Sequence, residues 1–370
     1  MRIFKIVSLI ALLIIGVLVA GGATLGWWLS APLSDADKQA LLKSPQYENG
    51  GFINIEPQAA FEFTWKSLTD ALSADSRSVP TGEIPVVPFP SKSLTLPPPE
   101  GLRVTWIGHA SVLVEIDGKR ILTDPVFSER VSPFSFIGPS RFHATPLKLK
   151  DLQGIDAVVI SHNHYDHLDK ATTRHLARKG TQFFLPLGNK TQLVQWGVPE
   201  GQIQELDWWQ EASIGSLKLI ATPTRHYSNR GTFDYKQTLW TSWTIIGPTN
   251  RLFYSGDTGY SSAFRQIGDR FGPFDVTIIK VGSYGPGDSW SDIHMPPEES
   301  IQVHRDVRGK TMLPVHWGTF NLAYHAWDEP IIRTIAAAEI ANINLLTPKI
   351  GEIVDVHNTG SFPHWWQGIN

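Results

Sequence analysis

The sequence predicts an α/β protein in which two β-sheets pack together and helices cover their outer faces. Two observations support this prediction. Strand-like runs followed by a helix-like segment occur twice, once in the middle of the chain and once in its second half. In addition, 42% of the 370 residues are hydrophobic and 18% are charged, which is enough apolar material for one large core or two ordinary ones.

The first group of strands is expected around a tight hairpin. Asp117 and Gly118 form the two-residue turn signal between the second and the third of these strands. A helix should follow over about residues 170–179, because Asp169 is a suitable N-cap and Gly180 a suitable stop. The strands themselves are expected at 102–106, 111–116, 120–123 and 157–160.

The second group repeats this order of strands and a helix. A helix over about residues 297–307 should begin with Pro297, and Glu298 and Glu299 lie in its first turn, where the helix dipole favours carboxylates. The strands are expected at 217–221, 242–246, 252–254, 276–280 and 312–315.

An apolar segment lies at the start of the chain. Residues 6–28 carry no charged side chain and can cross a hydrocarbon core of roughly 30 Å at about 1.5 Å per residue. Because Arg2 and Lys5 precede them, we expect residues 1–30 to form a single N-terminal transmembrane anchor, with the rest of the protein extracytoplasmic or periplasmic. The alternative is a signal segment that is cleaved to leave a secreted protein.

Residues 31–100 are expected to be an N-terminal extension that ends in a Pro-rich linker or strap. A helix is expected at 35–42, and prolines are dense between residues 80 and 99, which excludes helix interiors and central strands there. The domain that carries the function should therefore occupy residues 101–370.

The composition excludes several kinds of function. The sequence has no Cys, so disulfides, thiolate nucleophiles and thiolate metal ligands are all excluded. A formal net charge of −3 without a long Lys/Arg run argues against a nucleic-acid partner. The sequence also has no serine-hydrolase elbow, P-loop or dinucleotide fingerprint.

The segment His162-Asn163-His164-Tyr165-Asp166-His167 places three imidazoles and a carboxylate next to one another. Such a density is not expected by chance from 13 His in 370 residues. Imidazole and carboxylate together suit a borderline ion such as zinc better than calcium or magnesium, which prefer oxygen ligands alone. The segment therefore indicates a metal site directly after the strand at 157–160.

Three further candidate ligands follow strands of the second group. His226 lies shortly after 217–221, Asp257 after 252–254 and His316 after 312–315. If these strand ends meet at one edge of the sheets, seven candidate metal ligands converge there. They are His162, His164, Asp166, His167, His226, Asp257 and His316.

Several motifs in the chain resemble those of the metallo-β-lactamase superfamily. They are the 162–167 segment, Gly256-Asp257-Thr258-Gly259 and His316-Trp317-Gly318-Thr319-Phe320. Within the superfamily, the chain most resembles the branch of N-acylphosphatidylethanolamine-hydrolysing phospholipase D and its bacterial relatives. Further similarity to this branch occurs at 106–111, 122–125 and 239–243. The resemblance implies a four-layer αββα sandwich.

The resemblance also implies two Zn2+ ions per chain. His162, His164 and His226 would bind the first, Asp166, His167 and His316 the second, and Asp257 would bridge them. Other divalent transition metals suit the same ligands. A hydroxide that bridges two metal ions can attack at neutral pH, and the positive centre attracts an anion, so hydrolysis of a phosphodiester is expected.

Asp166, Asp257 and His294 are the candidate catalytic residues, and His294 and His325 are the candidate substrate-binding residues. His294 shortly precedes a helix start, where free N–H groups and positive potential favour a phosphate. His325 lies in a loop shortly after His316.

Two other polar residues have less certain roles in the sequence. Asp124 either starts a turn or orients a metal-bound histidine through the ring nitrogen that does not bind the metal. His109 is expected to be a structural turn residue.

Together these features predict a binuclear zinc metallohydrolase that acts on N-acylethanolamine-type phospholipids at a membrane, as a phospholipase D does. Two alternatives stay open. A hydrolase of the same fold could act on a soluble lactone, a cyclic phosphate or another ester, and a non-catalytic envelope protein could retain the metal site for stability. The sequence does not indicate an oligomeric state.

Overall fold

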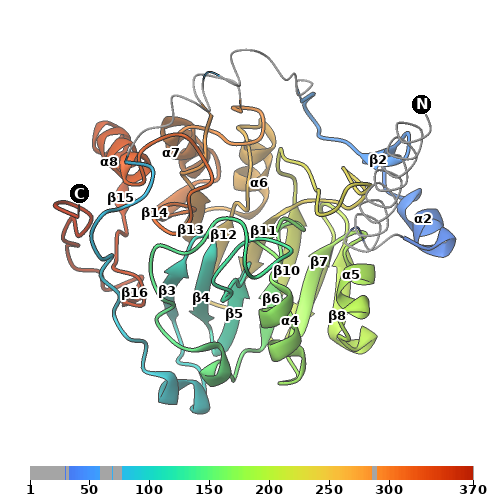
Figure 1. Cartoon of the computed structure of the whole chain (residues 1–370), viewed down its shortest axis with the longest axis horizontal. Coiled ribbons are helices and arrows are strands. Elements are labelled where there is room, and N and C mark those ends of the chain that lie inside the picture. Colours follow the sequence, from blue (N-terminus) through green and yellow to red (C-terminus); the bar gives the residue numbers. More distant parts are fainter. Residues whose placement is uncertain (1–29, 31–32, 59–68, 70–76, 286–289, 370) are drawn as a thin grey trace, which may run out of the picture.

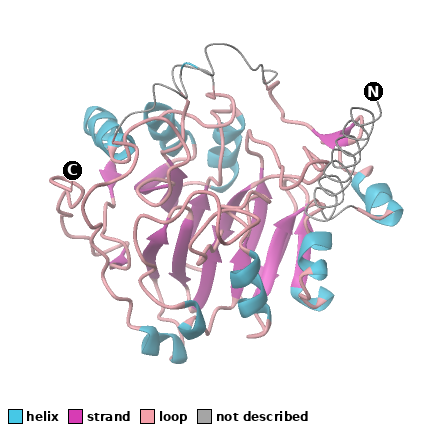
Figure 2. Cartoon of the chain, in the orientation of Figure 1, coloured by secondary structure: helices cyan, strands magenta, loops and turns pink. Residues whose placement is uncertain are grey.

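The computed structural model describes residues 30, 33–58, 69, 77–285 and 290–369, and two seven-stranded sheets form the centre of this part of the chain. The helices lie outside the sheets, as Figure 1 shows along the chain and Figure 2 by type of secondary structure.

The first sheet has the strand order β16-β3-β4-β5-β6-β7-β8. Strands β16 to β5 pair antiparallel, and β5 to β8 pair parallel. Helices α4 (Lys170–Ala177) and α5 (Lys190–Gln195) pack on its outer face. The strands are β3 Leu102–Gly108, β4 Ser111–Ile116, β5 Lys119–Thr123, β6 Ala157–Val159, β7 Gln182–Pro186, β8 Ile203–Leu206 and β16 Ile353–Asp355.

The second sheet has the order β15-β14-β13-β12-β11-β10-β9. Strands β9 to β12 pair antiparallel, and β12 to β15 pair parallel. Helices α6 (Ala263–Phe271), α7 (Pro297–Asp306) and α8 (Glu329–Ala341) lie on its outer side. The strands are β9 Glu211–Ile214, β10 Leu217–Thr222, β11 Ser242–Ile246, β12 Arg251–Tyr254, β13 Phe274–Lys280, β14 Gly309–Val315 and β15 Asn344–Leu345.

Alternation of side chains along the strands produces the layers. In β4, Val112 and Val114 belong to the core between the sheets, together with Trp243 of β11. Leu113, between these two valines, instead joins the apolar cluster that contains Leu176 of α4. Because successive side chains of a strand point to opposite faces, each sheet can bury both faces. The predicted four-layer αββα arrangement is confirmed.

Part of the N-terminal extension packs on this two-sheet body. The Pro-rich segment 80–99 runs beside the loop before β16, where the Val87 amide donates to the Ile350 carbonyl at 2.8 Å. Further along, the Phe89 amide donates to the Pro146 carbonyl at 2.9 Å. The elements of the extension are α2 Asp35–Leu41, β1 Tyr47–Glu48, β2 Gly51–Phe52 and a 3-10 helix Ser91–Thr95.

The predicted membrane anchor is not supported. Among the described residues, no helix is long and apolar enough to cross a membrane. Residues 6–28, on which the prediction fell, lie outside the described residues. The prediction of a membrane-anchored protein with a single N-terminal span is therefore corrected.

Every strand and helix expected in the two groups is present. The helices predicted at 35–42, 170–179 and 297–307 correspond to α2, α4 and α7. Asp169 caps α4, since its carboxylate accepts from the Ala171 amide at 3.0 Å. Asp117 (φ 45°) and Gly118 (φ 78°) adopt the positive φ that a tight hairpin requires. Among the described strands and α-helices, the sequence analysis omitted β1, β2, β7, β8, β9, β15, β16, α5, α6 and α8.

Candidate metal centre

The loops that follow β6, β10, β12 and β14 bring the seven candidate ligands together. His162 follows β6, His226 follows β10, Asp257 follows β12 and His316 follows β14. Nitrogen and oxygen atoms of these residues form overlapping groups in which all atoms lie within 4.8 Å of one another. The convergence expected from the strand ends is therefore present.

Three histidines form one half of the cluster, which we name the imidazole half-site. His162 Nε2 lies 2.8 Å from His164 Nδ1, and His226 Nε2 lies 3.4 Å from the same atom. Because His226 Nδ1 donates to the Ile293 carbonyl at 3.0 Å, its Nε2 lone pair faces the other two rings. Three nitrogens directed at one point suit a divalent transition metal.

The other half contains Asp166, His167, Asp257 and His316, and we name it the carboxylate half-site. His316 Nε2 lies 3.1 Å from Asp257 Oδ1 and 3.6 Å from Asp166 Oδ2. His167 Nε2 lies 3.3 Å from Asp257 Oδ2. Asp257 also groups with His226 within 4.8 Å, so its carboxylate lies beside both half-sites.

Several buried polar atoms of the carboxylate half-site fit a cation better than they fit one another. His167 Nε2, His316 Nε2 and Asp257 Oδ1 are all buried, and within the described part of the chain none makes a hydrogen bond of acceptable geometry. Buried polar atoms without a partner are costly, and a bound cation would satisfy all three. The cluster is thus suited to metal binding.

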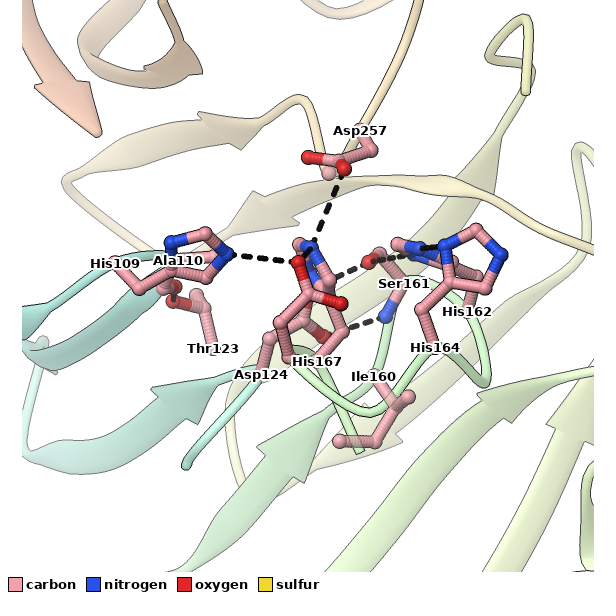
Figure 3. A network of polar contacts seen from close by, with 12 residues as sticks. His109, Ala110, Thr123, Asp124, Ile160, Ser161, His162, His164, His167 and Asp257 are labelled. Atoms are coloured by element: carbon pink, nitrogen blue, oxygen red, sulfur yellow. Dashed lines mark hydrogen bonds and ion pairs between the residues drawn. The ribbon is translucent and has the colours of Figure 1, made fainter. Parts of the chain in front are cut away.

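The fully buried carboxylate of Asp124 lies behind the rings. It accepts from His167 Nδ1 at 2.7 Å and from the Ser161 amide at 2.7 Å, and the Ser161 and Tyr254 hydroxyls also donate to it. Ser161 Oγ in turn lies 2.9 Å from His162 Nδ1. Figure 3 shows Asp124 and Asp257 on opposite sides of the His167 ring. One carboxylate therefore contacts a ring of the carboxylate half-site directly and a ring of the imidazole half-site through a serine.

His109 also lies in the cluster, although the sequence analysis treated it as a turn residue. Its φ of 52° fits a turn, but its Nε2 lies 3.0 Å from Asp166 Oδ2 and its ring centroid 3.9 Å from that of His316. Burial lowers the pKa of His109 to about 3, so the neutral ring donates to Asp166. Its place inside the 106–111 motif was the signal that could have identified it.

Burial keeps the rings of the imidazole half-site neutral in the metal-free protein. It lowers the pKa of His164 to about 4 and holds the pKa values of His162 and His226 well below their usual range. Neutral imidazole is the form that binds a metal, so these rings need not lose protons on binding.

In the carboxylate half-site, the neighbouring charges together outweigh the effect of burial on the pKa values. Burial alone would lower the pKa of His167, but the carboxylates of Asp257 and Asp166 raise it well above its usual value. Burial would likewise raise the pKa of Asp166, but the positive charge of His167 and the hydrogen bond from His109 hold it well below its usual range. Burial would also raise the pKa of Asp257, but the charges of His316 and His167 hold it well below its usual range, so both carboxyl groups are ionised at neutral pH.

His294 lies at the rim of the cluster, beside a lysine that the sequence analysis did not consider. Its Nδ1 is 3.7 Å from Asp257 Oδ2 and 3.2 Å from Lys280 Nζ. Burial lowers the pKa of Lys280 to about 8, which leaves the amine protonated at neutral pH. No sequence motif singles out this lysine; only its place at the end of β13 brings it to the site.

His325 contacts the backbone of a neighbouring loop. Its Nε2 accepts from the Ser283 amide at 3.0 Å and its Nδ1 lies 2.8 Å from the Ala326 carbonyl. It borders a small pocket that also includes His316. Its expected role in substrate binding stays a prediction.

The N-terminal extension reaches the imidazole half-site through Asn54. Asn54 Nδ2 donates to the His226 carbonyl at 2.9 Å, and Asn54 Oδ1 accepts from the His226 amide at 3.0 Å. Trp240 Nε1 donates to the same oxygen at 2.8 Å. A side chain far away in the sequence thus holds both polar backbone groups of His226.

A cavity of about 600 Å³ borders the 162–167 segment at Tyr165. The guanidinium of Arg230 stacks 3.9 Å from the centre of the Tyr165 ring and donates to the Asn163 and Leu168 carbonyls. None of the seven candidate ligands lines this cavity. Its other basic and large aromatic lining residues are Arg130, Phe134, Lys170, Arg174 and Trp196.

Known sequences agree with this fold and site. The family model described as "Beta-lactamase superfamily domain" matches residues 119–317. An uncharacterized protein of Mycobacterium tuberculosis is 43% identical over 335 residues, which cover 88% of this chain and 88% of the relative. N-acyl-phosphatidylethanolamine-hydrolyzing phospholipase D 1 of Caenorhabditis elegans is 31% identical over 318 residues, which cover 82% of this chain and 87% of the relative.

A solved structure has the same fold. Igni18, a metallo hydrolase of the archaeon Ignicoccus hospitalis, superposes with a TM-score of 0.53 at 22% identity, covering 68% of this chain and 97% of that one. Three observations indicate the same family: the two packed sheets, the His/Asp cluster at their edge and the matched sequences. The chain therefore belongs to the metallo-β-lactamase superfamily of metal-dependent hydrolases, and within it resembles the N-acylphosphatidylethanolamine-hydrolysing phospholipases D.

Proposed function

We propose that this protein is a binuclear zinc hydrolase that cleaves the phosphodiester of N-acylethanolamine-type phospholipids, as a phospholipase D does. The observation that carries the proposal is the position of Asp257 between two groups of metal-binding side chains. Its carboxylate lies close to His167 and His316 on one side and groups with His226 on the other. The C. elegans relative supports the lipid class of the substrate.

In this proposal each half-site would hold one ion, and Asp257, whose carboxylate lies beside both half-sites, would serve both. When bound, two such ions lower the pKa of a water enough to make a nucleophile at neutral pH and stabilise negative charge on the phosphate. Other divalent transition metals fit the same side chains. The first ion would be held by His162, His164 and His226, and the second by Asp166, His167 and His316.

The chain's own residues orient these ligands and receive the substrate. Asp124 holds His167 and, through Ser161, His162, so that the metal-binding lone pairs keep their direction. Asp166 and Asp257 reduce the positive charge of the centre, which favours a phosphodiester monoanion. His294 is part exposed at the rim, where it would donate to a phosphate oxygen.

The neighbouring cavity supports an amphipathic substrate. Its wall has net positive charge, because Arg130, Lys170, Arg174 and Arg230 outnumber Glu129 and Asp169, and Phe134 and Trp196 give it apolar surface. A phospholipid offers both features, an anionic headgroup and apolar chains. A small soluble lactone would leave most of this volume unfilled.

The proposal can be tested by metal analysis coupled to lipid hydrolysis. Zinc is measured on purified full-length protein, which then acts on dispersed N-acylated, plain and lyso phospholipids. We expect two zinc ions per chain and release of N-acylethanolamine from the N-acylated lipid only. His164→Ala should lose one zinc ion and most of the activity. The matched control His364→Ala, which changes an exposed histidine near the C-terminus, should behave as wild type.

Two outcomes would contradict the proposal. Cleavage of soluble bis-aryl phosphodiesters or lactones, with N-acylated phospholipids left intact, would contradict the substrate. If no ester or phosphodiester is cleaved while Asp257→Ala loses both a zinc ion and folding stability, the site is structural and the protein is not an enzyme.

A further inference from the structure

Lys280 is a buried lysine beside the candidate metal centre, and nothing in the proposed function uses it. It ends strand β13 and is only 1% exposed, which places it among the largest fully buried side chains of the described residues. Its backbone amide donates to Ser255 Oγ and its carbonyl accepts from Ser300 Oγ, so the start of its side chain is fixed. Burying an amine is costly, so its position requires a compensating contact.

The carboxylates of Asp257 and Glu299 attract the positive charge of Lys280, and its side chain contacts His294. Lys280 Nζ lies 3.2 Å from His294 Nδ1, and it makes no other side-chain hydrogen bond within the described ranges. An ammonium group has donors and no acceptor, so it donates and His294 Nδ1 accepts. A neutral imidazole that accepts at Nδ1 carries its proton at Nε2.

The backbone around His294 fixes where this second nitrogen lies. The His294 amide donates to the Trp290 carbonyl at 2.7 Å, and the following amide, of Met295, donates to the Thr258 carbonyl at 3.0 Å. The side chain of His294 is 14% exposed, and its ring centroid is 5.1 Å from that of His226. No described residue hydrogen-bonds to His294 Nε2, so this nitrogen is free to meet a ligand at the rim of the centre.

We propose that Lys280 is a positioning residue that locks His294 in the Nε2–H tautomer, so that His294 presents a hydrogen-bond donor to an oxygen of the bound phosphate. The identity of that acceptor rests on the proposed function, whereas the tautomer does not. Without the lysine, the Nδ1 proton would be drawn to Asp257 Oδ2, which lies 3.7 Å away. His294 Nε2 would then be a lone pair that repels a phosphate oxygen, and Asp257 would share its charge with a proton donor.

The tautomer can be measured directly by NMR. Full-length zinc-loaded protein with 15N-labelled histidine gives distinct nitrogen shifts for Nδ1–H, Nε2–H and doubly protonated rings, and His294→Gln identifies the signals of His294. We expect Nε2–H in the wild type and a shift to Nδ1–H in Lys280→Met, which keeps the length of the side chain and removes the charge. Lys280→Gln, which keeps an N–H donor, should retain the Nε2–H form.

Activity provides the second readout. With bis(p-nitrophenyl) phosphate as substrate and inorganic phosphate as inhibitor, Lys280→Met should lower kcat/KM and weaken phosphate inhibition by about tenfold each, the lower end for a residue behind a reacting group. Zinc content should stay at the wild-type value, and Lys280→Gln should recover part of the loss. Lys310→Met, at an exposed lysine paired with Asp275, is the matched control and should change nothing.

The two readouts separate the possible failures. A wild-type His294 that is Nδ1–H or doubly protonated, or a Lys280→Met variant with the wild-type tautomer, would overturn the role of Lys280. An unchanged kcat/KM and unchanged phosphate inhibition in Lys280→Met would overturn it equally. If instead the wild type cleaves no phosphodiester and binds no phosphate, the proposed function fails, while the NMR comparison still decides whether Lys280 sets the tautomer.

Discussion

The imidazole half-site and the carboxylate half-site are built on different physical principles. The first has three neutral rings and no carboxylate of its own, and its histidines are held by hydrogen bonds to Ser161, to Asn54 and to the Ile293 carbonyl. The second has two ionised carboxylates around two rings, with the third carboxylate of Asp124 behind one of them.

This difference indicates what each half-site depends on. Neutral ligands bind a metal well only when their lone pairs converge, so the imidazole half-site depends on accurate placement of the backbone. Carboxylates attract a cation over a longer range, so the carboxylate half-site depends on charge and tolerates small displacements better. Changes to positioning residues and changes to charges should therefore affect the two half-sites unequally.

The largest effect is expected for Asp124→Ala, because Asp124 holds His167 directly and His162 through Ser161, which is one ring of each half-site. The change leaves donors of Ser161, His167 and Tyr254 buried without their acceptor, at about 1–3 kcal/mol each. We expect the free energy of unfolding to fall by at least about 3 kcal/mol and zinc affinity to fall about 10–100-fold at both half-sites. Urea unfolding and zinc titration measure the two quantities. Loss of zinc from one half-site alone would show that Asp124 does not link them.

His226→Ala and His316→Ala form a pair that separates the half-sites. Each removes one proposed ligand, and Asp257 remains in place to serve the other ion. We expect each variant to bind one zinc ion instead of two and to lose most of the activity, since the proposed two-ion chemistry needs both ions. Native mass spectrometry counts the ions. A variant that loses both ions at once would mean that the two half-sites bind metal as a single unit.

A histidine outside both half-sites shows how strongly pH changes the free energy of unfolding when no metal ligand is involved. His304 of α7 hydrogen-bonds Thr277 Oγ1 at 2.8 Å, and burial lowers its pKa from 6.5 to about 4. Because the folded state binds this proton less readily than the unfolded state, stability is fully present above the unfolded pKa and is lost as the pH falls toward 4. The loss from this residue should reach about 2 kcal/mol at pH 5.

Urea unfolding of wild type and His304→Gln at pH 7.5 and pH 5 measures this contribution. The difference between the two proteins should be the same with and without zinc, because His304 contacts neither half-site. If the free energy of unfolding falls further at pH 5 only when zinc is present, this additional loss reports protonation of the metal ligands. If wild type and His304→Gln lose the same free energy of unfolding between pH 7.5 and pH 5, the lowered pKa of His304 is contradicted.

The seven candidate ligands named from the sequence converge in the structure, but the sequence did not indicate which residues hold them in place. The ligand types are recognisable because His and Asp at strand ends have a known metal-binding chemistry, and the packing of two sheets with helices outside follows from the strand and helix patterns. Tyr254 and Lys280 reach the site only because β12 and β13 end there, and both look like ordinary strand residues in the sequence. Residues whose role depends on a distant contact carry no local signal.

Asn54 is the clearest example of such a residue and gives the smallest effect. It is separated from His226 by 172 positions, yet its side chain donates to one backbone group of His226 and accepts from the other. Asn54→Asp keeps the acceptor for the His226 amide and loses the donor to its carbonyl. We expect zinc affinity to fall about tenfold at the imidazole half-site, the lower end for a residue behind a ligand, and to stay unchanged at the carboxylate half-site.

Zinc titration with competing chelator resolves the two affinities, and Glu56→Ala is the matched control. Glu56 anchors the same segment to Ser262, at the start of α6, without touching His226. A comparable loss in Glu56→Ala would mean that the extension acts only by packing as a whole. Asn54→Asp could also lower zinc affinity equally at both half-sites. In that case a displaced backbone at the imidazole half-site would also have weakened the carboxylate half-site. The two half-sites would then not differ in their dependence on backbone placement and on charge.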